Sequence, residues 1–215
     1  MRDFVVPPIG YSTKENTLLI FQEDHLSLYD LLYNPERDEL RRTMLDHKEK
    51  YSIAIQIAKI MATFHQFGIC HGHLTSHNIM LEQAHRRFQV KIADLELLPI
   101  FKHQNTFGDY RNASVWSSPE CLQNLRKMQE PTPEMDVYSF SMLMWELWHD
   151  TVPFDGDLPV CQEYVVKEDS RPMIEEKVDG EIAKLIRLCW QAQPEKRPKF
   201  TTICKILIQS IQPAT

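Results

Sequence analysis

The stretch EMDVYSFSMLMWELW, residues 134–148, constrains the fold more than any other part of this sequence. It is apolar on nearly every side at the 3.6-residue period, so it predicts a helix that is buried on most faces. Such a helix needs other elements packed around it. Asp136, near its start, is then a carboxylate that enters a core, where it needs hydrogen-bond donors.

The remaining elements are predicted from hydrophobic period and from turn residues. In chain order they are a strand at 4–12, a strand at 17–21, a short helix at 26–34, a solvated loop or exposed helix at 36–50, a helix at 50–69, a strand at 88–97, a long loop at 98–118, the buried helix, and helices at 179–190 and 200–211. The outline is a little strand structure first and mostly helix afterwards.

Composition limits the class of protein. With 215 residues, 43% of them hydrophobic, the chain can build one domain with a real core. Its net charge of -6 and its lack of a basic run argue against nucleic acid as the main partner. The five cysteines form no C-x-x-C pair, which suits free thiols in a reducing compartment. No apolar run approaches the roughly 20 residues of a membrane span, and no signal peptide is expected at the N-terminus, so we expect a cytoplasmic protein.

The motif CHGHLTSHNIML, residues 70–81, contains His71, His73 and His77. A zinc site, a proton shuttle and the remains of another active site are three interpretations of it. The zinc interpretation is the weakest, because only Cys70 could add a thiolate ligand and the H-E-x-x-H pattern is absent.

Several motifs in a fixed order resemble the protein kinase family. They are His71, Leu74 and Asn78 in the frame of H-R-D-L-x-x-x-N, then Asp94-Leu95-Glu96 at D-F-G, Ser118-Pro119-Glu120 at A-P-E, DVYSFSMLMWEL at the buried family helix, and PEKRPKF at the closing motif. The spacing is most similar to the tyrosine-kinase-like group, integrin-linked kinase in particular. The HGxLxSxN form also resembles the kinase-homology region of receptor guanylyl cyclases. Both comparisons are to proteins usually regarded as pseudokinases.

The resemblance implies an α+β, protein kinase-like fold with a mostly helical large lobe, remnant small-lobe strands and a hinge. Residues 1–215 would be a partial kinase-like domain, with the small-lobe strands and hinge at 1–25 and the large lobe at 26–215. No G-x-G-x-x-G occurs in the sequence. By resemblance, that phosphate-binding loop and the ATP-binding lysine would lie upstream of Met1.

The resemblance also implies a degenerate catalytic loop formed by His71, Gly72, His73 and Thr75. His73 stands at the catalytic aspartate, Gly72 at the arginine beside it and Thr75 at the lysine that assists phosphoryl transfer. Asn78 and Asp94 keep the family's positions for magnesium and nucleotide. No catalytic residue and no cofactor are therefore expected, with weak ATP and magnesium binding as the alternative.

Three further residues are implied to be structural. Asp136 would accept hydrogen bonds from the catalytic-loop backbone, and Glu120 would form a buried ion pair with Arg197. The implied function is a pseudokinase that acts as a scaffold or signalling regulator and binds a protein partner through the large lobe. The alternative is an ATP-dependent serine/threonine or tyrosine kinase that is active only in a longer form of the chain. Residues 150–169 lie near the family's docking helix and are the predicted partner surface, or else a solvated face.

Overall fold

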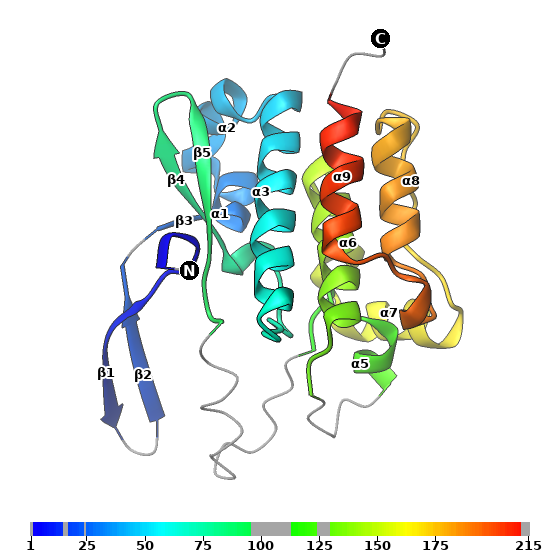
Figure 1. Cartoon of the computed structure of the whole chain (residues 1–215), viewed down its shortest axis with the longest axis horizontal. Coiled ribbons are helices and arrows are strands. Elements are labelled where there is room, and N and C mark those ends of the chain that lie inside the picture. The colour runs from blue at the N-terminus through cyan, green and yellow to red at the C-terminus, as the bar shows by residue number, and fades with distance from the viewer. Residues whose placement is uncertain (1, 15–16, 24, 96–112, 124–129, 212–215) are drawn as a thin grey trace.

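The computed structural model describes residues 2–14, 17–23, 25–95, 113–123 and 130–211. The strands in this part are β1 (Pro8–Lys14), β2 (Thr17–Gln22), β3 (Leu26–Ser27), β4 (Ile79–Ala84) and β5 (Arg87–Ile92). The α-helices are α1 (Leu28–Tyr33), α2 (Asp38–Met44), α3 (His47–Gln66), α5 (Pro119–Gln123), α6 (Pro133–His149), α7 (Leu158–Gln162), α8 (Gly180–Cys189) and α9 (Phe200–Ser210). Figure 1 shows the strands on one side of the molecule and the later helices on the other.

The strands form two separate antiparallel sheets. β1 and β2 make the hairpin that the sequence predicts, and β3, β4 and β5 make the second sheet in that order. The segment before the hairpin crosses to the second sheet, where the Val6 N–H donates to Ile92 O at 3.1 Å. The predicted start of the first strand is wrong, because residues Arg2–Phe4 form a 3-10 turn and β1 begins only at Pro8. Proline at 7 and 8 has no N–H to continue a ladder, which explains the delay.

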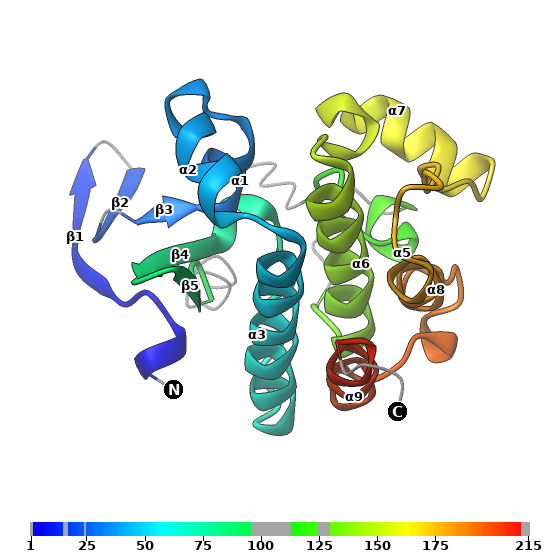
Figure 2. The same ribbon diagram turned by 90° about the horizontal axis from the view of Figure 1, so that it is seen from above.

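Helix α6 lies at the centre of the helical part, as its sequence predicts. Every residue from Asp136 to His149 is buried, and α6 packs against both α3 and α8. Helices α3 and α6 run side by side (Figure 2), and α9 packs on α3. Thr132 caps the start of α6 by accepting from the Met135 N–H at 3.3 Å. Helices α3 and α8 supply contacts that a helix buried on most faces needs.

Helix α3 confirms the predicted helix at 50–69 but begins three residues earlier. Its N-cap is Asp46, whose carboxylate accepts from the Glu49 N–H at 2.8 Å, and this cap fixes the start at His47. Within the polar stretch at 36–50, residues Asp38–Met44 form α2, none of whose residues is buried, and α3 begins at His47. Of the loop predicted at 98–118, residues 98–112 lie outside the described residues, and 113–118 have no helix or strand.

Two short helices were not predicted. Helices α5 and α7 have only five residues each, and α7 continues into a π-helix at Glu163–Lys167. Five residues make less than two turns, so they cannot show a helical period in the sequence.

Candidate functional site

The loop at 68–78 joins α3 to β4, and two glycines shape it. Gly68 and Gly72 have φ angles of 71° and 72°, a left-handed conformation that glycine adopts at no steric cost. At the end of α3 the Gly68 N–H donates to His65 O at 3.1 Å and the Ile69 N–H to Phe64 O at 2.9 Å. This is the pattern of a glycine-capped helix end, and it sets the direction in which the loop leaves α3.

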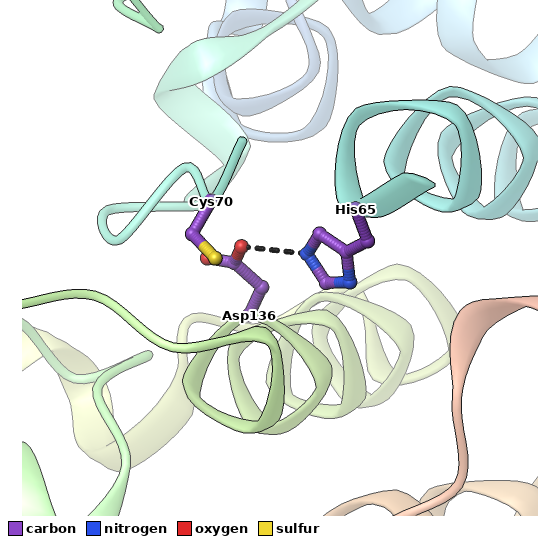
Figure 3. A group of neighbouring side chains, drawn as sticks. All are labelled: His65, Cys70 and Asp136. Atoms are coloured by element: carbon purple, nitrogen blue, oxygen red, sulfur yellow. Dashed lines mark hydrogen bonds and ion pairs between the residues drawn. The ribbon is translucent and has the colours of Figure 1, made fainter. Parts of the chain in front are cut away.

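Asp136, in the first turn of α6, holds this loop. Its Oδ2 accepts from the His71 N–H at 2.9 Å and its Oδ1 from the Gly72 N–H at 2.7 Å. Oδ2 also lies 2.9 Å from His65 Nε2, at the end of α3 (Figure 3). The sequence predicted the contact with the loop backbone, and both bonds are present. The contact with His65 was not predicted.

His71 is buried, and its contacts fix its tautomer. Its Nδ1 accepts from the His73 N–H at 3.2 Å, so Nε2 carries the proton and donates to Ala93 O at 3.0 Å. Burial lowers the pKa of His71, although the nearby charge of Asp136 opposes that effect. The ring is therefore a neutral bridge between the loop and the end of β5, which is a packing role and not a proton shuttle.

The other residues of the motif have different surroundings. His73 is half-buried, and Thr75 is buried with its Oγ1 unpaired among the described residues. His77 is exposed, but its ring stacks on Tyr29 of α1 at a centroid distance of 3.8 Å and meets Trp116 edge-on at 6.0 Å. Burial of the ring lowers the pKa of His77. In the described structure, the three histidines of the motif do not form a group that could share a metal ion.

Asn78 and Asp94 are the two positions considered for magnesium. Asn78 Nδ2 donates to His73 O at 2.8 Å, while its Oδ1 makes no hydrogen bond to the rest of the described chain. Asp94 follows β5 with a φ of 62°, which is uncommon for a residue other than glycine. Amide and carboxylate oxygens are ligands that Mg²⁺ prefers, so the two residue types fit that ion. Glu96, which stands at the glycine of D-F-G in the resemblance, lies outside the described residues.

A different group has the geometry of a metal site. Ligand atoms of His65, Cys70 and Asp136 lie within 4.8 Å of one another (Figure 3). However, Asp136 already accepts from two backbone N–H groups. Burial, and then the charge of Asp136, raises the pKa of the Cys70 thiol to about 11, whereas a metal binds the thiolate. These contacts favour a hydrogen-bonded group that ties α3, the loop and α6 together.

Glu146 is a second buried carboxylate of α6, and it joins three segments. Its Oε1 accepts from Ser76 Oγ at 2.8 Å and from Tyr33 Oη at 3.1 Å, and its Oε2 accepts from Trp116 Nε1 at 2.7 Å. Burial raises its pKa to about 7, although these three donors act in the opposite direction. Sequence analysis missed this contact. The available signal was an acidic residue inside an otherwise apolar helix, which requires donors from elsewhere in the chain.

Glu120 and Arg197 form the ion pair that the sequence predicts. Arg197 Nη1 and Nη2 donate to the two carboxylate oxygens of Glu120 at 2.7 and 2.9 Å. The Arg197 side chain has no exposed area, and that of Glu120 is 25% exposed. A bidentate, buried pair of this kind fixes α5 to the turn that precedes α9.

Comparison with known proteins defines the class of protein. The family model described as protein tyrosine and serine/threonine kinase matches residues 2–207. The chain belongs to this family, and its two-sheet, mainly helical α+β structure is a kinase-like fold. No helix in the described residues is both long enough and apolar enough to span a membrane.

Individual relatives agree with the family. The chain is 32% identical over 179 residues to the serine/threonine/tyrosine-protein kinase HT1 of Arabidopsis thaliana, an alignment that covers 77% of this chain and 43% of the relative. It is 31% identical over 182 residues to a probable serine/threonine-protein kinase of Dictyostelium discoideum, covering 84% and 18%. It is 29% identical over 223 residues to guanylate cyclase 2G of Mus musculus, covering 94% and 19%. The chain thus spans less than half the length of each of these relatives.

Proposed function

We propose that this chain is a pseudokinase domain that acts as a protein-interaction scaffold or signalling regulator. The observation that carries the proposal is His73, which occupies the position of the family's catalytic aspartate. That aspartate accepts the proton of the substrate hydroxyl as an anion. Imidazole is neutral or cationic, so it is a poor replacement beside a bound magnesium ion.

Two neighbouring positions support the same conclusion. Thr75 has no charge at the position of the lysine that stabilises the transferred phosphoryl group, and its hydroxyl is buried. Gly72 has no side chain at the position of the arginine that meets an activation-loop phosphate.

The supporting framework, in contrast, is kept. Asp136 holds the loop backbone, and Arg197 holds Glu120. We assign these three residues structural roles in a large lobe at 26–215, with small-lobe strands and a hinge at 1–25. The match to a guanylate cyclase is in line with a non-catalytic kinase-homology region, and similarity to integrin-linked kinase remains part of this proposal. A scaffold needs these structural contacts to keep the shape of its surface, but it does not need the catalytic groups.

The alternative is a kinase that is active in a longer form of the chain. Asn78 and Asp94 favour it, because both oxygen ligands for magnesium are present and Asp94 holds an uncommon left-handed backbone. Under this alternative, His73 would have to act as the proton acceptor, and nucleotide would bind with magnesium at Asn78 and Asp94.

Thermal unfolding with and without ATP and magnesium separates the two functions. For a pseudokinase that does not use nucleotide, we expect the Tm of the 215-residue chain to stay unchanged when millimolar Mg·ATP is added, because no ligand then stabilises the native state. A magnesium-dependent rise in Tm, followed by phosphate incorporation that both Asp94→Ala and Asp94→Asn abolish, would refute the proposal. Asp94→Asn keeps the size of the side chain and removes only its charge, so it distinguishes loss of the carboxylate from loss of packing.

A further inference from the structure

The segment from 155 to 176 is strongly acidic. It contains seven acidic residues and two basic ones, whereas the whole chain has a net charge of only -6. In α2, by comparison, acidic and basic residues lie together: Asp38 is 2.8 Å from Arg41 and 4.0 Å from Arg42. We call residues 155–176 the acidic segment. It includes α7, the π-helix and the turn that follows them.

The acidic segment also exposes large apolar side chains. Cys161 and Val165 point into the core and are buried. On the outward side, Val160 is 41% exposed and Tyr164 is 46% exposed, and further along the chain Met173 is 79% exposed. The Tyr164 ring is also packed from one side, at 6.2 Å from the Phe154 ring. An exposed apolar patch that is surrounded by charged side chains is typical of a protein–protein interface.

Part of the negative charge has no internal partner. Lys167 pairs with Glu163 at 3.0 Å, and Arg171 pairs with Asp169 at 3.2 Å. The exposed side chains of Asp155, Glu168 and Glu176 have no ion pair with any other described residue. Their field is therefore not cancelled locally, and it favours a cationic partner.

We propose that α7 and the π-helix dock a basic segment of another protein, one in which an aromatic or aliphatic side chain lies between lysine or arginine residues. The apolar side chain would cover Val160 and Tyr164, and the cations would face Asp155, Glu163 and Glu168. This inference rests on the proposed function as an interaction module and names the chemistry of its partner.

The negative charge of the acidic segment argues against a second copy of the chain, a nucleic acid or an anionic membrane as its partner. In a symmetric dimer, the same negative surface would face its own copy, and like charges in an interface are unfavourable. Nucleic acids and anionic membranes carry the same sign as the acidic segment and would be repelled. A basic protein segment is the occupant that gains from both the apolar contacts and the field.

The test selects peptides from a random 12-residue library against the immobilised chain and measures their affinities by fluorescence anisotropy. We expect enrichment of lysine or arginine around an aromatic or aliphatic residue, with binding that weakens as salt rises from 50 to 300 mM. Tyr164→Ala and Glu168→Lys should each weaken the best peptide by at least roughly tenfold. Leu188→Ala and Glu39→Lys are matched controls, because they remove an equally exposed apolar side chain on α8 and reverse a charge on α2.

The proposal is overturned if the selected peptides are not basic, or if Tyr164→Ala and Glu168→Lys bind them as well as the controls do. It is also overturned if sedimentation shows a dimer that Tyr164→Ala dissociates, since the occupant would then be a second copy. These results are independent of the Mg·ATP experiment: catalysis would refute the pseudokinase while leaving the peptide measurements intact.

Discussion

Removing the charge of Glu120 should destabilise the protein strongly, because it leaves the Arg197 charge buried without its partner. All five N–H groups of Arg197 are used: two bind Glu120, and three bind the carbonyl oxygens of Glu134, Gln191 and Ala192 at 2.9, 2.8 and 3.2 Å. Glu120→Gln keeps the shape of the side chain but offers one neutral oxygen in place of two charged ones. Only the carboxylate side of this pair has any contact with solvent.

The size of the effect follows from burial. Breaking one side of a buried ion pair costs about 3–5 kcal/mol, and the partial exposure of Glu120 points to the lower end, about 3 kcal/mol. The matched control is Glu181→Gln. Glu181 lies only 2.6 Å from Lys184, but both side chains are more than half exposed, so we expect a loss of less than about 0.5 kcal/mol. Distance alone would predict the opposite order.

Urea unfolding followed by circular dichroism measures both variants. The free energy of unfolding is compared at equal m-values, so that a change in midpoint reports stability. The Arg197→Met variant and the double variant complete a cycle, whose coupling energy should reach at least about 1 kcal/mol for groups in direct contact. The reasoning is refuted if Glu120→Gln and Glu181→Gln lower the free energy of unfolding by the same amount.

Three further predictions concern groups with distinct roles. Asp46→Ala removes the N-cap of α3 and should cost about 1 kcal/mol in urea unfolding, whereas Asp46→Asn should cost much less. Glu146 has a pKa raised above its unfolded value, to about 7, so it stabilises the fold at low pH and this contribution is lost as pH rises through 7. Between pH 5 and pH 8, the free energy of unfolding of the native protein should therefore fall by roughly 2–3 kcal/mol more than that of Glu146→Gln. Cys70, with its pKa raised to about 11, should react with iodoacetamide at pH 8 on the order of 100-fold more slowly than a cysteine in a free peptide, as followed by mass spectrometry.

Each of these predictions has a result that contradicts it. Equal losses for Asp46→Ala and Asp46→Asn would mean that the cap does not fix the start of α3. Parallel pH curves for the native protein and Glu146→Gln would mean that the carboxylate is ionised throughout this range. Fast labelling of Cys70 in the folded protein would mean that its thiol is neither buried nor close to a negative charge.

Long elements were predictable because each shows a period in the sequence. The helix at 50–69 and the all-round apolar helix at 134–148 were predicted within three residues at each end, since burial on a known face repeats at every turn. The helices α5 and α7 were missed because five residues contain too few turns to repeat. The start of β1 was misplaced because apolar residues before Pro7 fit a strand, although the prolines prevent them from pairing as one.

The candidate site was predictable to a different extent. The family resemblance implied that Asp136 accepts from the loop backbone and that Glu120 pairs with Arg197, and both contacts are present. The contacts of Glu146 and His65 were not found. Their partners lie between 30 and 113 residues away in the sequence, and no local pattern identifies a partner at that separation.

The sequence by itself determined the kinase-like frame, the buried central helix, and the presence of His73 and Thr75 in the motif at 70–81. Residue identity and the local hydrophobic period can both be read directly from the sequence. The tertiary structure alone decided which groups meet: His71 becomes a neutral bridge, Glu146 joins three segments, and the acidic segment turns Val160 and Tyr164 outward. The physical reason is that hydrogen bonds and burial depend on distances between residues far apart in the chain, which form only when α3, α6 and the loop between α3 and β4 pack together.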